Sequence, residues 1–354
     1  MARVRRVIPP SRTLVTGGAG FIAGELIETL LADGGEVTVL DDLSTAEPDW
    51  LVRFGGDSRL TFMRGDCADA DAVGTAMVGV DRVIHLASGT DIAGGFDRPW
   101  LDFRNGIVAT EVVCEAMHRG GVRELWYASS GVVYGRPSRI PTAEGDGPLL
   151  PCSHYAAAKL AGEAIVSGFA HLYDWHAFAF RFGNTVGPRS NHGVVHDFVV
   201  KLLRDPHHLE ILGDGTPRKP YVAVSDLIAG MRHGVSTIAE PGLAILNVGP
   251  EGTVSVRRVA EIVIDAVGLD ARSVAVTFQQ STGAGGGGWP GDTALVEFDT
   301  RAMRALGWAP AMQAEDAIRH AADGIAARYR DGARPLLTSI ERRAERALGQ
   351  PNAR

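Results

Sequence analysis

The chain has 354 residues, of which 45% are hydrophobic and 22% are charged, as in ordinary globular proteins rather than disordered ones. Its formal net charge of −7 argues against broad nucleic-acid binding, because no surplus of basic residues exists to neutralise phosphates. The sequence has no apolar run of about 18 residues, so no membrane-spanning helix and no membrane partner are expected. Three widely spaced cysteines and an N-terminus without the apolar core of a signal peptide predict a reduced, cytoplasmic protein.

The first half of the chain alternates short apolar or β-branched runs with longer helical patterns. This alternation is typical of βαβ units and predicts a parallel sheet. We expect an α/β fold built on a Rossmann-like, doubly wound parallel sheet. The expected strands are Thr13–Thr16, Val37–Leu40, Leu60–Met63, Arg82–Leu86, Glu124–Ser129 and Ala177–Phe182, and the expected helices are Gly24–Leu31, Leu101–Arg119 and His154–Leu172.

Beyond Arg181 the regular alternation gives way to loops rich in glycine, proline and asparagine. This half predicts a smaller α/β substrate-binding lobe, interleaved with the last strands of the sheet. We place the first domain at residues 1–184 with later sheet elements at about 219–249, the lobe at 185–218 and 250–335, and a helical tail at 336–354. The expected elements here are helices near Val194–Leu203, from Asp226, near Val256–Val267 and near Ala314–Tyr329, and strands at Tyr221–Val224 and Ala244–Val248.

A glycine-rich turn follows the first expected strand, in the run Thr16-Gly17-Gly18-Ala19-Gly20-Phe21-Ile22-Ala23. Small residues between a strand and a helix let backbone amides and the helix N-terminus approach a pyrophosphate. Asp41 follows Gly20 by 21 residues, close to the spacing at which a carboxylate meets the adenosine ribose hydroxyls. Because a carboxylate there would repel a 2′-phosphate, we predict that the cofactor is NAD rather than NADP.

Further cofactor contacts are expected where the next strands end. Asp66 stands where a carboxylate could accept a hydrogen bond from the adenine amino group, although a helix N-cap before Ala68 is an alternative that is compatible with it. Leu86-Ala87-Ser88 would lie along the cofactor, while His85 is expected to pack within the sheet.

The pattern Tyr155-Ala-Ala-Ala-Lys159 predicts a catalytic pair, because residues four apart on a helix share a face. An ammonium about 4 Å from the phenol would supply roughly the 4 kcal/mol that lowers a tyrosine pKa from near 10 to about 7. The nicotinamide ring of an oxidised cofactor would add a second positive charge, and we therefore expect Tyr155 to act as a general base at neutral pH. Ser130, at a strand end, could hydrogen-bond both a substrate oxygen and the tyrosine, although alone it could be an ordinary turn residue.

The residues assigned to NAD are Gly17, Gly20, Phe21, Ile22, Asp41, Asp42, Ser44, Asp66, Cys67, Leu86, Ala87, Ser88, Tyr155 and Lys159. For Asp42, a solvated position in the loop is an equally good explanation.

Together these motifs resemble the extended short-chain dehydrogenase/reductase family, and within it the NAD-dependent epimerase/dehydratase branch. The resemblance runs from about Thr13 to Tyr329. The matching motifs are Thr16-Gly-Gly-Ala-Gly-Phe-Ile, Leu40-Asp-Asp-Leu-Ser, Gly65-Asp66, His85-Leu-Ala, Ser129-Ser-Gly-Val-Val-Tyr-Gly135, Tyr155-Ala-Ala-Ala-Lys159, Arg181-Phe-Gly-Asn184, Gly187-Pro-Arg189 and Gly213-Asp-Gly215 with Arg218. The resemblance implies a catalytic set of Ser130, Tyr155 and Lys159, and an NAD that stays bound through turnover.

The same resemblance implies that the substrate is a nucleotide sugar. Asn184 and Arg218 would hold its diphosphate and ribose, and a guanidinium suits a pyrophosphate. A loop-stabilising amide and a surface salt bridge are the plainer roles for these two residues. Thr90, Ser130 and Asp292 complete the expected substrate contacts. The family often has an arginine near Gly283–Asp292, and Gly287 fills its place here, so one phosphate contact is missing.

The two positions after Ser130 bear on the reaction. Family members that eliminate water resemble one another in having acidic residues there, because dehydration needs a proton donor and a base beyond the tyrosine. This chain has Gly131 and Val132, which favours a nucleotide-sugar 4-epimerase working through NADH and a transient 4-keto sugar. The alternatives are a 4-ketosugar reductase or dehydrogenase on the same fold and a non-catalytic NAD-binding scaffold.

By resemblance we also expect a homodimer, formed by the helices Leu101–Arg119 and His154–Leu172. Trp100, Val112 and Val113 would be buried in its interface, unless they face the sheet. His192 and His196 share a helical spacing without a third ligand, so no metal is expected.

Overall fold

The computed structural model describes residues 8–46, 54–89, 92–279, 288–330, 335–342 and 345. Thr90, Gly287 and most of the tail at 336–354 therefore lie outside the described residues.

The centre of the molecule is a seven-stranded sheet with the order β11-β6-β5-β4-β1-β2-β3. Every pair of neighbouring strands in it is parallel. The chain leaves β1 in one direction along the sheet and returns to β4 on the other side, which confirms the predicted doubly wound fold. The strands are β1 (Arg12–Thr16), β2 (Glu36–Asp41), β3 (Leu60–Arg64), β4 (Arg82–His85), β5 (Glu124–Ser130), β6 (His176–Phe182) and β11 (Gly242–Val248).

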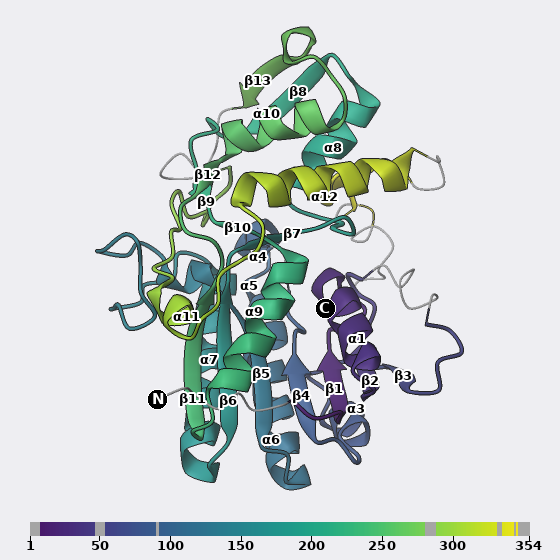
Figure 1. The fold of residues 1–354 in the computed structure, drawn as a ribbon, viewed down its shortest axis with the longest axis vertical. Coiled ribbons are helices and arrows are strands. Elements are labelled where there is room, and N and C mark those ends of the chain that lie inside the picture. The colour runs from purple at the N-terminus through teal and green to yellow at the C-terminus, as the bar shows by residue number, and fades with distance from the viewer. Residues whose placement is uncertain are drawn as a thin grey trace.

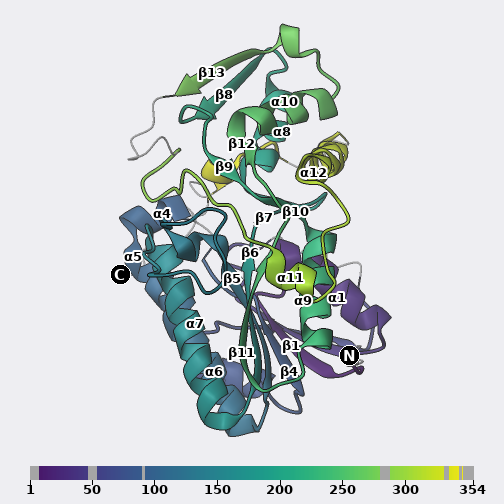
Figure 2. The same ribbon diagram turned by 60° about the vertical axis from the view of Figure 1, so that its left-hand side comes forward.

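Helices cover both faces of this sheet (Figures 1 and 2). On β1, Val15 packs into the core beneath α1 (Phe21–Ala32) and α9 (Val224–Thr237), and the adjacent Leu14 packs into the opposite core. Successive strand residues point to opposite faces, so a strand buried on both sides reads as a continuous apolar run. The helices of the second face are α3 (Ala70–Ala76), α6 (Ala109–Gly120) and α7 (His154–Tyr173).

The single helix predicted at Leu101–Arg119 is instead three segments, which follow α4 (Ile92–Asp97). They are α5 (Pro99–Asp102), a π-helical segment η1 (Phe103–Val108) and α6. At this widened turn the Thr110 hydroxyl donates to the Gly106 carbonyl at 2.6 Å. Gly106 also packs tightly on α7, since a β-carbon built on it would lie 2.7 Å from Ala158 Cβ. Such π-helical turns are frequent at functional sites, and an apolar pattern does not distinguish them from an α-helix.

The second lobe has its own apolar core, between α8 (Val194–Arg204), α10 (Val256–Ala266) and α12 (Ala314–Tyr329), at the top of Figure 1. Three two-stranded sheets join it. They pair β7 (Asn184–Val186) with β10 (Tyr221–Ala223), β8 (His208–Leu212) with β13 (Ala275–Gln279), and β9 (Arg218–Lys219) with β12 (Val254–Ser255). The remaining elements are α11 (Arg301–Ala305) and two 3-10 turns, η2 (Gly131–Tyr134) and η3 (Ala271–Ser273).

The residues predicted to line a dimer interface lie in different environments. Val113 is fully buried against the sheet, so its predicted place in an interface is wrong, and Val112 packs partly against the same core. Trp100 is 63% exposed and stacks on Phe103 with ring centroids 5.0 Å apart. Among the helices described, none is long and apolar enough to cross a membrane.

Candidate active site

The glycine turn after β1 leaves room for a ligand at the start of α1. Gly17 has a φ of +64° and donates from its amide to the Leu40 carbonyl at 2.9 Å. A β-carbon on Gly17 would lie 2.6 Å from the Ala87 amide, so the turn tolerates no side chain there. Gly20 precedes α1 without a side-chain cap, which leaves the helix N-terminus open toward an anion. The uncapped helix N-terminus and the absence of side chains at this turn fit the pyrophosphate of a dinucleotide.

Asp41, at the end of β2, fastens this turn. Its carboxylate accepts from the Ala19 amide at 3.0 Å and from the Leu43 amide at 2.8 Å. Burial raises the pKa of Asp41, and these two hydrogen bonds act against that increase. Each carboxylate oxygen has a second lone pair, so ribose hydroxyls can still donate to it. Next to it, Asp42 accepts from the Ser44 amide at 2.8 Å within the loop.

Asp66, predicted to meet the adenine, is held by two neighbours. Its Oδ1 accepts from the Ala68 amide at 2.8 Å, and its Oδ2 pairs with Arg104 of η1. Because α3 begins at Ala70 with Asp69 as its N-cap, the alternative role of Asp66 as a helix cap is wrong.

Several other residues predicted to contact the cofactor have side chains that pack into or against the core. The Cys67 side chain is buried in the core, where burial raises the pKa of its thiol to about 12. The Leu86 amide donates to the Thr16 carbonyl at 3.1 Å, which brings the segment Leu86–Ser88 alongside the glycine turn. Phe21 and Ile22 begin α1 and pack against its core. His85 is 1% exposed within the sheet, as expected.

The fold brings together the three predicted catalytic residues. Ser130 ends β5, and its hydroxyl lies close enough to Tyr155 to lower the pKa of the phenol. The helix α7 begins one residue before Tyr155, because Ser153 caps it by accepting from the Ala156 amide at 3.1 Å. Lys159, one turn along, is 3% exposed, and its Nζ lies 5.8 Å from the centroid of the Tyr155 ring.

The protein's own groups do not acidify Tyr155, contrary to the prediction. Burial raises its pKa to about 12, the hydrogen bond with Ser130 lowers it, and the carboxylate of Asp102 raises it further. The pKa of Lys159 falls to about 7 because burial disfavours its ammonium, and Glu163 only partly opposes this effect. Lys159 also donates to the Ala128 carbonyl at 2.7 Å. A cation that is itself weakened by burial cannot offset the desolvation of a phenolate.

Of the residues predicted to bind the substrate, Asn184 and Asp292 lie near each other, whereas Arg218 has partners elsewhere. Asn184 and Tyr221 are partners in the β7–β10 ladder. Burial raises the pKa of the Tyr221 phenol, the Asn184 side chain lowers it, and the charge of Asp292 raises it further. Asp292 accepts from Lys219 Nζ at 3.1 Å and from the Gly288 amide at 3.2 Å.

The contact of Gly291 and the position of Arg218 complete this side of the predicted site. A β-carbon on Gly291 would lie 3.1 Å from Ser153 Cβ, so the turn that carries Asp292 rests against the start of α7. Arg218 is exposed and instead donates to Thr253, at 2.9 Å to Oγ1 and 2.8 Å to its carbonyl.

Two residues that the motifs did not indicate are prominent in the site. Lys219 is 9% exposed and Glu163 is 3% exposed. A signal for both was available in the sequence. The chain contains only three lysines, Lys159, Lys201 and Lys219, among its 35 basic residues, and Glu163 stands one helical turn after Lys159.

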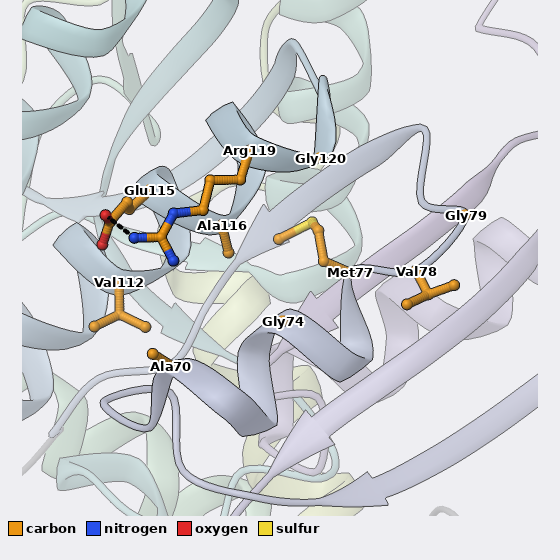
Figure 3. A pocket seen from close by; sticks show the side chains of 10 residues that line it. All are labelled: Ala70, Gly74, Met77, Val78, Gly79, Val112, Glu115, Ala116, Arg119 and Gly120. Atoms are coloured by element: carbon orange, nitrogen blue, oxygen red, sulfur yellow. Dashed lines mark hydrogen bonds and ion pairs between the residues drawn. The ribbon is translucent and has the colours of Figure 1, made fainter.

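A surface hollow of about 300 Å³ lies elsewhere, between α3 and α6 (Figure 3). It includes Met77, Val112 and the ion pair between Glu115 and Arg119, and none of its lining residues belongs to the predicted site. The described residues contain no group of three His, Cys, Asp or Glu side chains placed to hold a metal ion.

Comparison with known proteins identifies the family. Residues 13–249 match the model of the NAD dependent epimerase/dehydratase family. The chain belongs to this family. It is therefore related to enzymes that act on nucleotide sugars, and its cofactor is NAD.

Its relatives in this family carry different activities. A UDP-glucose 4-epimerase from Mycolicibacterium smegmatis is 35% identical over 87% of this chain and 96% of its own length. A dTDP-glucose 4,6-dehydratase from Streptomyces griseus is 32% identical over 86% of this chain and 91% of its own. The crystal structure of the Thermus thermophilus UDP-glucose 4-epimerase in complex with NAD is similar with a TM-score of 0.76 and 30% identity, over 89% of this chain and 98% of that one.

Proposed function

We propose that the protein is an NAD-dependent UDP-hexose 4-epimerase. The observation that supports this reaction over dehydration is the packing at Gly131, next to Ser130. A β-carbon on Gly131 would lie 2.6 Å from two atoms of the Phe298 ring and 3.1 Å from Val296. An acidic side chain therefore does not fit there unless Phe298 moves. The wall of the site is apolar where elimination of water would need an additional acid or base.

In this proposal the side chains act on the sugar 4-hydroxyl. Ser130 hydrogen-bonds the reacting oxygen and orients it toward Tyr155, which removes the hydroxyl proton and later returns it. Lys159 holds positive charge beside the tyrosine. NAD, held by the glycine turn at Gly17 and by Asp41, would supply reversible hydride transfer at carbon 4 and the further positive charge that a tyrosinate needs. Return of hydride to the opposite face of the 4-keto sugar inverts carbon 4 without net oxidation.

We further propose that Lys219, rather than Arg218, is the cation that faces the substrate diphosphate. Lys219 is buried beside Asp292. The turn that carries Asp292 rests on the start of α7. Arg218, its neighbour on β9, is directed to Thr253. Adjacent residues of a strand point to opposite sides, so only one of the two can face the site. Asn184 remains a predicted contact for the diphosphate and ribose, and Asp292 remains a predicted substrate contact.

The experiment is incubation of the purified protein with UDP-glucose or UDP-galactose, without added reductant. Formation of the C4 epimer, followed by chromatography, is the expected result, and the Tyr155→Phe variant is the control. Loss of water from the sugar, or turnover only when a reduced nicotinamide is supplied, would contradict the proposal.

The second candidate is a 4-ketosugar reductase. It is favoured by the high pKa of Tyr155, since a phenol that stays protonated is suited to donate a proton to a ketone. Cofactor exchange separates the two functions. An epimerase keeps NAD bound and copurifies with it, whereas a reductase consumes one reduced cofactor for each sugar. A cytoplasmic location and a homodimer remain predictions from the sequence.

A further inference from the structure

Glu163 is a buried carboxylate that the proposed reaction does not use. It lies on α7, one turn beyond Lys159 and two turns beyond Tyr155, and is 3% exposed. Charged side chains are rarely buried to this extent unless they are paired.

The carboxylate of Glu163 joins three elements directly beneath the catalytic residues. Its Oε1 accepts from Arg181 Nε of β6 at 2.9 Å, and its Oε2 accepts from Arg181 Nη2 at 2.7 Å. The hydroxyl of Ser129, on β5, also donates to it. Ser129 directly precedes Ser130, so one carboxylate links the strand end that carries Ser130 to the helix that carries Tyr155 and Lys159.

The partner Arg181 is fixed in turn. Its Nη1 donates to the Glu144 carbonyl at 3.1 Å, and its guanidinium lies 4.8 Å from the centroid of the Tyr134 ring. A guanidinium does not lose its proton in proteins, and a bidentate pair holds the carboxylate in one geometry. Arg181 therefore holds the Glu163 carboxylate in place.

Of the groups that face Lys159, Glu163 is the one whose charge favours the ammonium form of the lysine. From the sheet, His85 and the Tyr127 ring face it, the latter with its centroid 5.3 Å from Nζ. Burial lowers the pKa of His85 to about 3 and raises that of Tyr127, so both are neutral near pH 7. From its own helix, Lys159 is faced by Tyr155 and by Glu163.

We propose that Glu163 is a positioning residue for the reaction, which keeps Lys159 an ammonium and holds Ser130, Tyr155 and Lys159 in register. Its influence reaches the substrate only through these residues. The inference rests on the proposed function, in which the positive charge of Lys159 supports the ionisation of Tyr155.

The small number of lysines makes this inference directly measurable. Protein labelled with [¹³Cε]lysine contains three lysine side chains to observe, and the Lys159→Met variant assigns the signal of Lys159. The titration midpoint of Lys159 is compared between the wild-type protein, Glu163→Gln, and the double variant Glu163→Gln/Arg181→Met. The double variant removes both charges, so it does not leave Arg181 buried and unpaired.

In folded Glu163→Gln we expect the Lys159 midpoint to fall by about one pH unit, and in the double variant, which also loses the cation of Arg181, we expect a smaller fall, with Lys201 and Lys219 unchanged in both. The alkaline limb of kcat against pH should move by the same amount, while KM for the UDP-sugar stays within about twofold of wild type. Glu163→Asp should restore part of the shift. The matched control Glu210→Gln, beside Lys201, should leave Lys159 unchanged.

An unchanged Lys159 midpoint in the folded double variant would overturn the inference, whatever reaction the protein catalyses. If the midpoint falls as expected but no epimer forms in the wild-type protein, the proposed function fails while the link between Glu163 and Lys159 stands.

Discussion

The two sides of the candidate site are built differently. On the side of the sheet, Lys159, Glu163 and Arg181 are all at most 3% exposed, and their hydrogen bonds link α7 to β5 and β6. On the side of the second lobe, Arg218 is exposed, and the two-residue strand β9 is joined to the segment after Asp292 by the ion pair of Lys219 and by backbone hydrogen bonds of Arg218.

The difference matches what each side would do. Proton and hydride transfer require reacting atoms placed within a fraction of an ångström, which packed strand ends and a long helix provide. A nucleotide sugar has to enter and leave, and a turn held by a few polar contacts opens at a lower free-energy cost than a core does. Substitutions on the sheet side should therefore affect catalysis and stability, and those on the lobe side should affect binding.

The largest effect is expected for Tyr155→Phe. Removing the hydroxyl that moves the proton should lower kcat by about a thousandfold, within the usual range for general acid-base groups. Tyr173→Phe, at the far end of the same helix and 37% exposed, should keep close to wild-type activity. Initial rates of epimer formation provide the measurement. A near-normal kcat for Tyr155→Phe would contradict the proposal that the residues on the sheet side carry out the reaction.

The second prediction compares a buried ion pair with an exposed one. Glu163→Gln leaves the guanidinium of Arg181 buried without its partner charge, which should cost about 3 kcal/mol of unfolding free energy. Glu315→Gln breaks the exposed pair with Arg258 in the second lobe and should cost less than about 1 kcal/mol. Urea denaturation of both variants measures the two unfolding free energies. Equal losses would show that burial does not decide how much an ion pair contributes to stability.

The third prediction concerns the unfolding free energy that is lost because the charge of Lys159 is buried. Its pKa falls to about 7 in the fold from an ordinary value of 10.5, so between these values the unfolded chain binds more protons. The loss of unfolding free energy is therefore complete below pH 7 and disappears as the pH rises to 10.5. The stabilising effect of Lys159→Met should therefore be about 4 kcal/mol larger at pH 7 than at pH 10.5. Unfolding free energies measured from pH 6 to 10.5 test this, and a benefit independent of pH would contradict it.

Much of the sheet side could be predicted from the sequence. The apolar runs gave β1 to β6 with boundaries that differ from the structure by at most one residue, since strands buried on both faces leave a clear pattern. The convergence of Ser130 with Tyr155 follows from the same reasoning, because strand carboxyl ends share one edge of a parallel sheet.

Other features depend on contacts that a linear pattern does not contain. β8 and β13 pair across more than 60 residues, and neither was predicted. The ionisation of Tyr155 was misjudged because helical spacing reports the distance to Lys159 but not the desolvation of both groups. The partner of Glu163 lies on another strand, so its role is visible only in the fold.

The smallest effect is expected on the lobe side, where two neighbouring cations can be compared. Lys219→Met removes a buried charge that we place against the diphosphate and should raise KM for the UDP-sugar about tenfold, a change of about 1.4 kcal/mol, with kcat little altered. Arg218→Met is the matched control, because its guanidinium is directed to Thr253, and KM should change by less than about twofold. Steady-state kinetics with the same UDP-sugar separate the two. If Arg218→Met raises KM and Lys219→Met does not, then Arg218 binds the substrate as its sequence motif predicts, and Lys219 serves only to hold Asp292 and its turn.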